Sequence, residues 1–383
     1  MKILLTGATG YIGFQLLHTL VSAGNRVVCC VRDIDRFSPP ESMKDSIETV
    51  QVDFLDSDTL SKIPRDIDAA YYLMHSMSGS ANYQNLELTC AENFRKVISA
   101  TAAEHVIYLG GILNEDNLSE HLASRKAVES ELAKGTYNFT AIRSGIVVGS
   151  GSGSFEIIRD LVEKLPVMIT PKWLKTKCQP ISVFDVMKFL HLSLKNPKTY
   201  NKIFDIGGPD ILTYKQMLLE YAKFRKLLRL IISVPVLTPR LSSYWLYLVT
   251  ETSYRLAHAL VSSMKIDITC QNQELQQLLS IEPMNYTSAL AVALPDLEQQ
   301  PSANPQLVSS EEKNDLSVSS DWLNTPEHGC LKDKKTANVT DIETTMQKIW
   351  AIGGDTGWYY ANWLWKLRAV LDEMIGGVGL GSG

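Results

Sequence analysis

The stretch that decides the fold lies at the start of the chain, where the apolar run Lys2-Ile3-Leu4-Leu5 leads into Thr6-Gly7-Ala8-Thr9-Gly10-Tyr11-Ile12-Gly13. The run before the turn is typical of a buried parallel strand. Residues 14–23 then carry apolar side chains at helical spacing, and Gly24 ends that helix. Residues 26–31 predict a second strand. The order is therefore strand, glycine turn, helix and strand within about 30 residues, which makes the turn a candidate binding site.

The three glycines of this turn, spaced GxxGxxG, have separate physical roles. Gly7 permits a tight turn, Gly10 lets the backbone approach a pyrophosphate, and Gly13 allows the helix to pack closely on the strand. The start of the helix adds unpaired N–H groups and a partial positive charge, which favour phosphate. The alternative is a glycine turn that binds nothing.

The end of the second strand bears on which nucleotide is bound. A residue about 20 positions past the glycines meets the adenosine ribose in such folds. Arg32 stands there with Asp33 directly after it. An arginine accommodates the 2′-phosphate of NADP, whereas an acidic residue favours the free hydroxyl of NAD. We expect NADP(H), with NAD possible; the alternative is that Arg32 is a solvated charge.

Strands and helices continue to alternate along the chain. Further strands are predicted at 49–52, 69–74, 106–109 and 140–148, with a helix over 82–103. This alternation predicts an α/β fold with a Rossmann-type doubly wound parallel sheet and a ligand at the carboxyl ends of its strands. The expected nucleotide contacts are Gly7, Thr9, Gly10, Tyr11, Ile12, Gly13, Arg32, Asp53, Leu73 and Gly110.

Composition limits the remaining function classes. The 383 residues are 45% hydrophobic and 21% charged, with a net charge of −5, as in an ordinary globular protein of about two domains. The acidic balance argues against a nucleic-acid partner. The six cysteines form no CxxC pair and no metal-ligand pattern. No signal peptide or membrane-spanning run is recognised, so we expect a cytoplasmic protein without a metal.

These motifs, together with Arg143-Ser144-Gly145, the stretch 180–186 and Phe204 to Pro209, resemble the atypical short-chain dehydrogenase/reductase superfamily. The stretches 149–173 and 234–245 are similar to a branch related to NmrA-like proteins and to the NAD(P)-binding subunit of respiratory complex I. The resemblance covers residues 1–285. It implies an NAD(P)-binding domain that includes a substrate subdomain at 150–285, and a START-like domain of unknown function further along the chain.

The catalytic pattern of that superfamily is missing here. Its members use a Ser, a Tyr and a Lys, the last two spaced YxxxK on one helix face. Alignment on Glu129 puts His121 at the Tyr place and Arg125 at the Lys place, while the Ser place falls on Gly110-Gly111. Either His121 replaces the Tyr as acid/base and Arg125 holds the ribose, or no proton chemistry occurs here. Other candidates are Tyr71, Tyr72, His75 and Tyr108.

The second half of the chain leaves several alternatives open. The loop 149–154 is either a mobile lid or a connector. Trp173, Phe184 and Trp245 belong either to an apolar pocket or to a core. The apolar stretch 227–264, which contains several arginines, is expected to be buried against the sheet or a partner subunit, with peripheral membrane contact as the alternative.

The remaining residues divide into a polar linker at 286–340 and a segment at 341–383 that resembles the beginning of the START-like domain, here truncated. The expected function is therefore that of an oxidoreductase acting on a small carbonyl or quinone-like substrate. The alternative is a non-catalytic redox sensor or assembly factor that keeps the nucleotide. The chain's partners are then a pyridine nucleotide and a small molecule, and a homo-oligomer is left open.

Overall fold

The computed structural model describes residues 1–74, 83–113, 120–234 and 266–294, together with positions 341, 348, 362–364, 366 and 370. The chain divides into two compact units, Met1–Leu316 and Ser317–Gly383. The architecture below belongs to the first unit.

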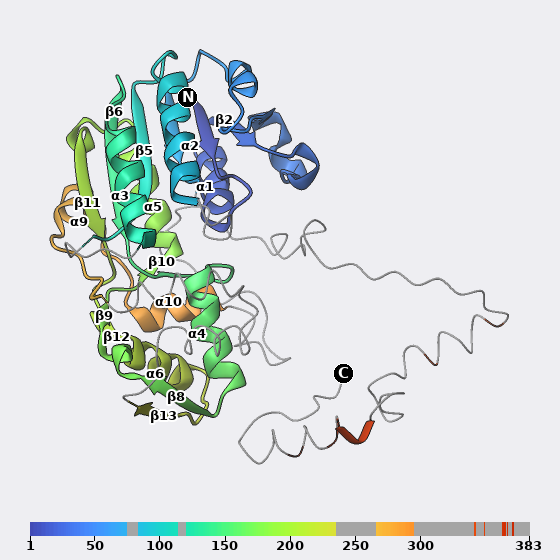
Figure 1. Ribbon diagram of the computed structural model, residues 1–383, viewed down its shortest axis with the longest axis vertical. Helices are drawn as coiled ribbons and strands as arrows, with labels where there is room; N and C mark the ends of the chain where they lie inside the picture. The colour runs from blue at the N-terminus through green and yellow to red at the C-terminus, as the bar shows by residue number, and fades with distance from the viewer. Residues whose placement is uncertain are drawn as a thin grey trace, which may run out of the picture. The chain divides into compact units, whose positions relative to one another are not determined.

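Seven strands form one parallel sheet in the order β11-β6-β5-β4-β1-β2-β3 (Figure 1). Their bounds are β1 Lys2–Thr6, β2 Arg26–Val31, β3 Ile47–Gln51, β4 Ala69–Tyr72, β5 His105–Gly111, β6 Asn138–Ser144 and β11 Lys202–Ile206. Every pairing among them is parallel. The predicted α/β class with a Rossmann-type sheet is therefore confirmed.

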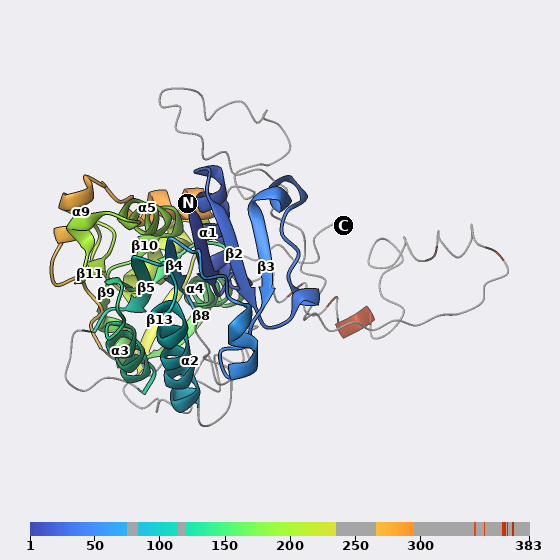
Figure 2. The same ribbon diagram turned by 90° about the horizontal axis from the view of Figure 1, so that it is seen from above.

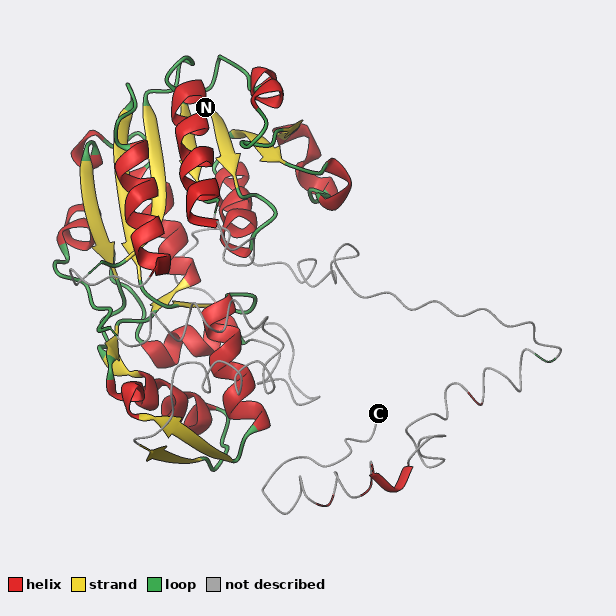
Figure 3. Cartoon of the chain, viewed as in Figure 1, coloured by secondary structure: helices red, strands yellow, loops and turns green. Residues whose placement is uncertain are grey.

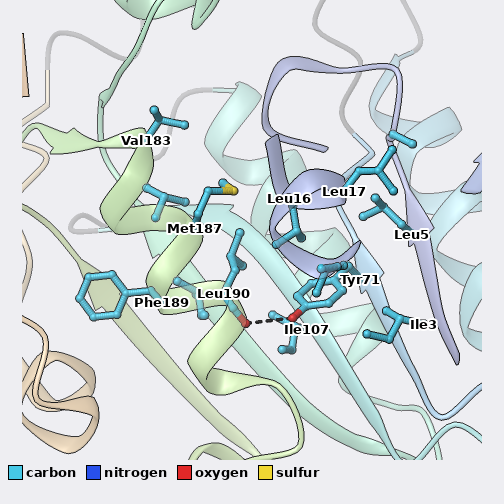
Figure 4. Packing of buried hydrophobic residues seen from close by; sticks show 14 of the residues in the cluster. Ile3, Leu5, Leu16, Leu17, Tyr71, Ile107, Val183, Met187, Phe189 and Leu190 are labelled. Atoms are coloured by element: carbon cyan, nitrogen blue, oxygen red, sulfur yellow. Dashed lines mark hydrogen bonds between the residues drawn. The ribbon is translucent and has the colours of Figure 1, made fainter. Parts of the chain in front are cut away.

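Helices cover both faces of this sheet, as the view from above shows (Figure 2). One face packs against α1 (Tyr11–Ser22), α5 (Val183–Ser193) and α9 (Glu274–Leu279), and the other against α2 (Tyr83–Ile98) and α3 (Glu120–Leu132). Because both faces are buried, the strands are apolar at successive positions rather than alternating. Leu16 and Leu17 of α1 and Leu190 of α5 pack on the first face (Figure 4).

The order of the strands reverses at β1, which pairs with β2 on one side and with β4 on the other. The connection that follows β1 and the one that follows β4 therefore diverge at their carboxyl ends. In open α/β sheets, ligands bind at such a reversal. The glycine turn after Thr6 lies at this point of the sheet.

A second lobe follows β6 (Figure 3). It contains β7 Val147–Val148, α4 Gly153–Lys164, β8 Val167–Pro171, β9 Lys177–Cys178, β10 Ile181–Ser182, β12 Leu212–Thr213, α6 Tyr214–Phe224, β13 Leu230–Val234 and α10 Tyr286–Ala293. Its strands pair two by two, β10 with β7, β12 with β9 and β13 with β8. Its own apolar core includes Phe155 of α4, Tyr221 of α6 and Leu290 of α10.

Several predicted boundaries differ from the observed ones. The first helix begins at Tyr11 rather than at residue 14, so the glycine turn runs directly into it. The predicted strand 140–148 is two strands, because the chain leaves the main sheet after Ser144. The predicted linker also begins too early at 286, since α10 buries Tyr286, Ala289 and Leu290 in the second lobe.

Three further observations bear on the class of protein. Cys29, Cys30, Cys90, Cys178 and Cys270 are all free thiols, and Cys330 lies outside the described residues. Within the described ranges there is no His, Cys, Asp or Glu cluster that could hold a metal ion. The helices of those ranges are also too short or too polar for any of them to cross a membrane.

Candidate nucleotide-binding site

The glycine turn closes through its own backbone. Gly10 N–H donates to the Gly7 carbonyl at 2.9 Å, and Phe14 N–H donates to the Gly10 carbonyl at 2.9 Å. Gly7 has a φ of +73°, and a Cβ there would lie 2.8 Å from the carbonyl oxygen of Leu73. Only glycine fits this position, because both the dihedral and the approach of the β4 end exclude a side chain.

Gly13 and Gly10 differ in what surrounds them. A Cβ on Gly13 would lie 2.1 Å from the Gly7 carbonyl oxygen, so this glycine is needed for helix α1 to approach the turn. A Cβ on Gly10 would meet only the Gly7 oxygen, at 3.3 Å. Gly10 is exposed, and its φ of −87° is accessible to any residue. The absence of a side chain at Gly10 therefore leaves open space in front of the helix start.

The first turn of α1 has no acidic residue, and its N-cap Gly10 supplies no side-chain acceptor. A helix start leaves several N–H groups without intrahelical partners, together with a partial positive charge. Thr6 fixes this start relative to β4, since its buried hydroxyl donates to Tyr71 O and accepts from Leu73 N–H, both at 3.1 Å. The arrangement is an anion-binding geometry at the reversal point of the sheet.

Arg32 and Asp33, at the end of β2, have different roles. The Asp33 carboxylate accepts from Asp35 N–H at 3.0 Å and caps the short helix Ile34–Arg36. The Arg32 side chain is exposed and forms no hydrogen bond or ion pair with any described residue. Its carbonyl oxygen accepts from Gln51 Nε2 at 3.2 Å. The Arg32 guanidinium is thus accessible to a ligand at this strand end, while the Asp33 carboxylate caps the short helix that follows.

Asp53 lies just past β3, in a loop that it organises. Its Oδ1 accepts from Leu55 N–H at 3.0 Å, and Thr59 Oγ1 donates to its carbonyl oxygen at 2.9 Å. Asn93 of α2 holds the same loop, donating from Nδ2 to Phe54 O at 2.8 Å. Burial, followed by the charge of Asp53, raises the pKa of Cys90 to about 11. The thiol beside this loop is therefore protonated at neutral pH.

Gly110, the last of the predicted nucleotide contacts, lies near the end of β5. A Cβ there would lie 2.9 Å from Cε1 of Tyr108. The Tyr108 hydroxyl donates to Arg125 O at 3.3 Å, so this ring lies beneath α3. Gly110, at the predicted Ser place, therefore makes room for a buried tyrosine, while a Cβ on Gly111 would lie 3.2 Å from Cδ2 of Leu122. Sequence reasoning missed this relation because it depends on a contact between strand and helix.

The two predicted catalytic residues lie on α3. Arg125 Nη1 donates to Leu109 O at 3.2 Å near the end of β5, while its Nε is buried without a hydrogen-bond acceptor among the described residues. His121 is half-buried in the first turn of the helix. One turn later, the buried Ser124 donates to the carboxylate of Glu87 on α2. The helix is thus tied to β5 and to α2, and the catalytic roles of His121 and Arg125 stay predictions.

The tyrosines considered as alternative catalytic residues are buried, and their side chains contact other parts of the core. Tyr71 donates to Leu190 O at 2.9 Å on the opposite face of the sheet (Figure 4), and burial raises its pKa. Tyr72 is fully buried against Phe94, with ring centroids 4.9 Å apart. Burial also raises the pKa of Tyr108. These three side chains are core residues, and His75 lies outside the described residues.

A contact that the sequence does not reveal joins the glycine turn to the second lobe. The phenol of Tyr11, the first residue of α1, lies against the loop after β7: a Cβ on Gly149 would be 2.3 Å from its Oη, and one on Gly151 would be 2.8 Å from its Cδ2. Ser150 Oγ donates to Ala293 O at 2.7 Å, and Gly151 N–H donates to Glu156 Oε1 at 2.8 Å. These two hydrogen bonds hold the loop where it meets the phenol, and burial raises the pKa of Tyr11.

A partly buried ion pair fixes the neighbouring end of β6. Arg143 donates from Nε and Nη2 to the two carboxylate oxygens of Glu129 at 2.8 and 2.6 Å. In the sheet, Arg143 pairs in register with Gly110 on one side and Asp205 on the other. Burial raises the pKa of Asp205, whose carboxylate accepts from Gln271 N–H at 3.2 Å. This network binds α3 to the sheet beside the predicted site.

The predicted aromatic pocket is described only in part. Phe184 is half-buried and packs against the core shared by α1 and α5. Trp245 and the side chain of Trp173 lie outside the described residues. For Phe184, therefore, the core interpretation is the one that the structure supports.

Comparison with known proteins agrees with this geometry. Residues 3–125 match the NAD dependent epimerase/dehydratase family. A divinyl chlorophyllide a 8-vinyl-reductase of Cucumis sativus is 24% identical over 224 residues, which are 54% of this chain and 53% of that protein. The chain thus spans about half the length of the curated relatives it matches.

Solved structures extend the likeness of the fold over most of the first unit. The triphenylmethane reductase of Citrobacter sp., complexed with NADP(H), has a TM-score of 0.62 and 14% identity, covering 77% of this chain and 100% of that one. An NADPH-dependent quinone oxidoreductase of Escherichia coli, complexed with NADPH, has a TM-score of 0.61 and 17% identity, covering 76% and 99%. The N-terminal segment is therefore similar in sequence to the NAD dependent epimerase/dehydratase family, and the chain shares the fold of NAD(P)-binding reductases.

Proposed function

We propose that this protein binds NADP(H) at the glycine turn and is an oxidoreductase for a small carbonyl or quinone-like substrate. The observation that carries the proposal is the open, uncapped start of α1, where Gly10 leaves space and no acidic side chain competes for the N–H groups. This cradle fits a diphosphate, because a helix start and close main-chain donors favour a doubly charged group. The reductases with the same fold that bind NADP(H) support the choice of ligand.

Different residues of this chain would bind different parts of the nucleotide. The first turn of α1 would hold the diphosphate. Arg32, whose side chain forms no ion pair with a described residue, would hold a 2′-phosphate, since Asp33 is committed to its cap. Asp53 would face the adenine, and Leu73 and Gly110 would line the remaining length. A bound nicotinamide would supply or accept the hydride. In this proposal His121 exchanges the accompanying proton, and Arg125 holds the nicotinamide ribose.

Titration of the full chain with NADPH and NADH, followed by turnover assays on carbonyls and quinones, tests this proposal. Arg32→Ala should weaken the binding of NADPH about tenfold, because one charge-assisted hydrogen bond at an exposed site contributes about 1.5 kcal/mol. The same change should leave the binding of NADH nearly unchanged. Equal effects on both nucleotides would remove the assignment of Arg32. Turnover that persists in His121→Ala would remove the proposed proton donor.

A non-catalytic role is the second candidate, and a specific observation favours it. Gly110-Gly111, His121 and Arg125 stand at the places where catalytic short-chain dehydrogenases have their Ser, Tyr and Lys. Tyr71, Tyr72 and Tyr108 are buried. A protein of this kind would keep the nucleotide as a redox sensor or as a stabilising group in an assembly factor. Tight binding of NADPH without turnover on any substrate of the panel would support it.

We also propose that residues 341–383 belong to a START-like domain and that the chain works in the cytoplasm. The resemblance of the segment around 350–380 supports the first statement, and the free thiols are in keeping with a reducing compartment. Proteolysis of the full chain tests the first, since a folded segment would leave a protected fragment that contains residues 341–383. Localisation of a tagged full chain tests the second.

A further inference from the structure

An apolar sheet face is exposed on the second lobe, far along the chain from the nucleotide turn. Strands β8 and β13 pair in parallel, with Leu230 opposite Val167. The inward residues Met168 and Ile231 are buried in the core of the lobe. Parallel strands normally have both faces covered, so the outer face of this pair needs an explanation. Its position at the end of the lobe is visible in Figure 1.

The outer side chains are aliphatic and protrude. Leu228 is 92% exposed, Leu230 56%, Val167 48% and Ile232 45%. Leu230 and Ile232 are two residues apart in β13 and therefore lie on one side of the strand, and Leu228 precedes them in the adjoining loop. Together, these four side chains form what is called here the β13 face. A contiguous set of exposed aliphatic residues marks a contact surface more often than chance exposure does.

Positive charge predominates in the part of the chain that leads into β13, although the whole chain carries a net charge of −5. Residues 214–232 contain five cationic side chains, Lys215, Lys223, Arg225, Lys226 and Arg229, and one acidic side chain, Glu220. The acids of the adjacent helix α4 are largely neutralised, because Glu163 pairs with Arg225 at 2.6 Å and Asp160 pairs with Lys164 at 3.3 Å. No described residue forms an ion pair with Lys223 or Lys226, and both are exposed.

We propose that the β13 face docks on an anionic lipid surface. Protruding aliphatic side chains enter the interface of a bilayer without a shaped pocket, while flanking lysines attract acidic headgroups. A second copy of the chain is a poorer occupant, because its own β13 face would bring the same excess of positive charge. The docking would place the second lobe of the protein against a membrane surface without any of the described helices crossing the membrane.

Flotation of the full chain with vesicles tests the proposal. The protein should float with vesicles of equal amounts of phosphatidylcholine and phosphatidylglycerol, and much less with phosphatidylcholine alone. Raised salt should weaken the binding, because it screens the lysines. Leu228→Ser combined with Leu230→Ser should lower partitioning by roughly tenfold or more. These side chains are already exposed, so the double variant should keep the unfolding temperature of the parent.

Charge reversal and matched controls complete the test. Lys223→Glu with Lys226→Glu should lower partitioning by about tenfold or more. Leu55→Ser and Lys96→Glu, which change exposed residues on the nucleotide-binding part, should bind as the parent does. The proposal is overturned if the parent does not float with the anionic vesicles or if both sets of β13-face variants bind like the controls. Self-association of the parent that the double serine variant abolishes would assign the face to a second copy instead.

Discussion

Gly10→Ala separates nucleotide binding from folding. The new methyl group would meet only the Gly7 oxygen, at 3.3 Å, so the turn needs to yield by a few tenths of an ångström. The backbone at Gly10, with φ −87° and ψ 160°, is favourable for alanine. Any strain is offset by the lower chain entropy of the unfolded state, which is worth about 0.4–1 kcal/mol. We therefore expect the free energy of unfolding to change by no more than about 1 kcal/mol.

The same methyl group should strongly reduce affinity for NADPH. It projects into the space through which the diphosphate would approach the N–H groups of α1. Loss of one charge-assisted hydrogen bond costs about 1.5–3 kcal/mol, which corresponds to roughly ten- to hundredfold weaker binding. Isothermal titration calorimetry with NADPH measures this loss, and urea unfolding of the same preparation measures stability.

Two other glycines serve as controls. Gly13→Ala places a Cβ 2.1 Å from the Gly7 oxygen and should lower stability by several kcal/mol, because helix and turn are forced apart. Gly24→Ala meets no atom within 4 Å but has a φ of +78°, so it should cost about 1 kcal/mol and leave affinity unchanged. A folded Gly10→Ala protein that binds NADPH as the parent does would refute the reasoning.

Two further predictions follow from buried contacts. Gly149→Ala places a Cβ 2.3 Å from Tyr11 Oη and should weaken NADPH binding by displacing the ring toward the helix start. Adding Tyr11→Ala to this variant should restore much of the NADPH affinity. Additive losses of affinity in this double-mutant cycle would argue against a coupling between Tyr11 and Gly149. His105 accepts from Lys195 N–H and its other ring nitrogen lies 2.8 Å from Thr140 Oγ1, while burial lowers its pKa to about 4. The folded pKa of His105 lies below the unfolded value of about 6.5, so the folded state favours the neutral ring. The contribution of His105 to the free energy of unfolding is therefore full above pH 6.5 and declines by up to about 3 kcal/mol as the pH falls toward 4. Urea unfolding across that range should show a shallower pH dependence for His105→Gln, and an unchanged slope would assign the effect to other groups.

More of the fold than of the candidate site could be predicted from the sequence. The glycine turn could be predicted because all its determinants lie within residues 6–13, and the parallel sheet because both its faces are buried and its strands are continuously apolar. The split of 140–148 was missed because both halves are apolar and only the departure from the main sheet at Ser144 separates them. Helix α10 was assigned to a linker because it is short and its apolar face is recognisable only against α6 and β10.

The position of a candidate site residue could be predicted only where a single strand end determines it. Arg32 and Asp53 lie at strand ends whose order is set by the topology. The burial of Tyr108 under Gly110, by contrast, depends on where α3 crosses the sheet. The bond between Ser124 and Glu87 likewise depends on the packing of two helices. Such relations join residues distant in the chain, and spacing within one sequence does not contain them.

The contact of Tyr11 with Gly149 and Gly151 has a kinetic consequence. Withdrawal of that loop uncovers one side of the first turn of α1, and departure of the ring from the loop disturbs the same turn. Exchange of a ligand at the glycine turn and rearrangement of the second lobe should therefore occur as linked events with a common rate, rather than independently.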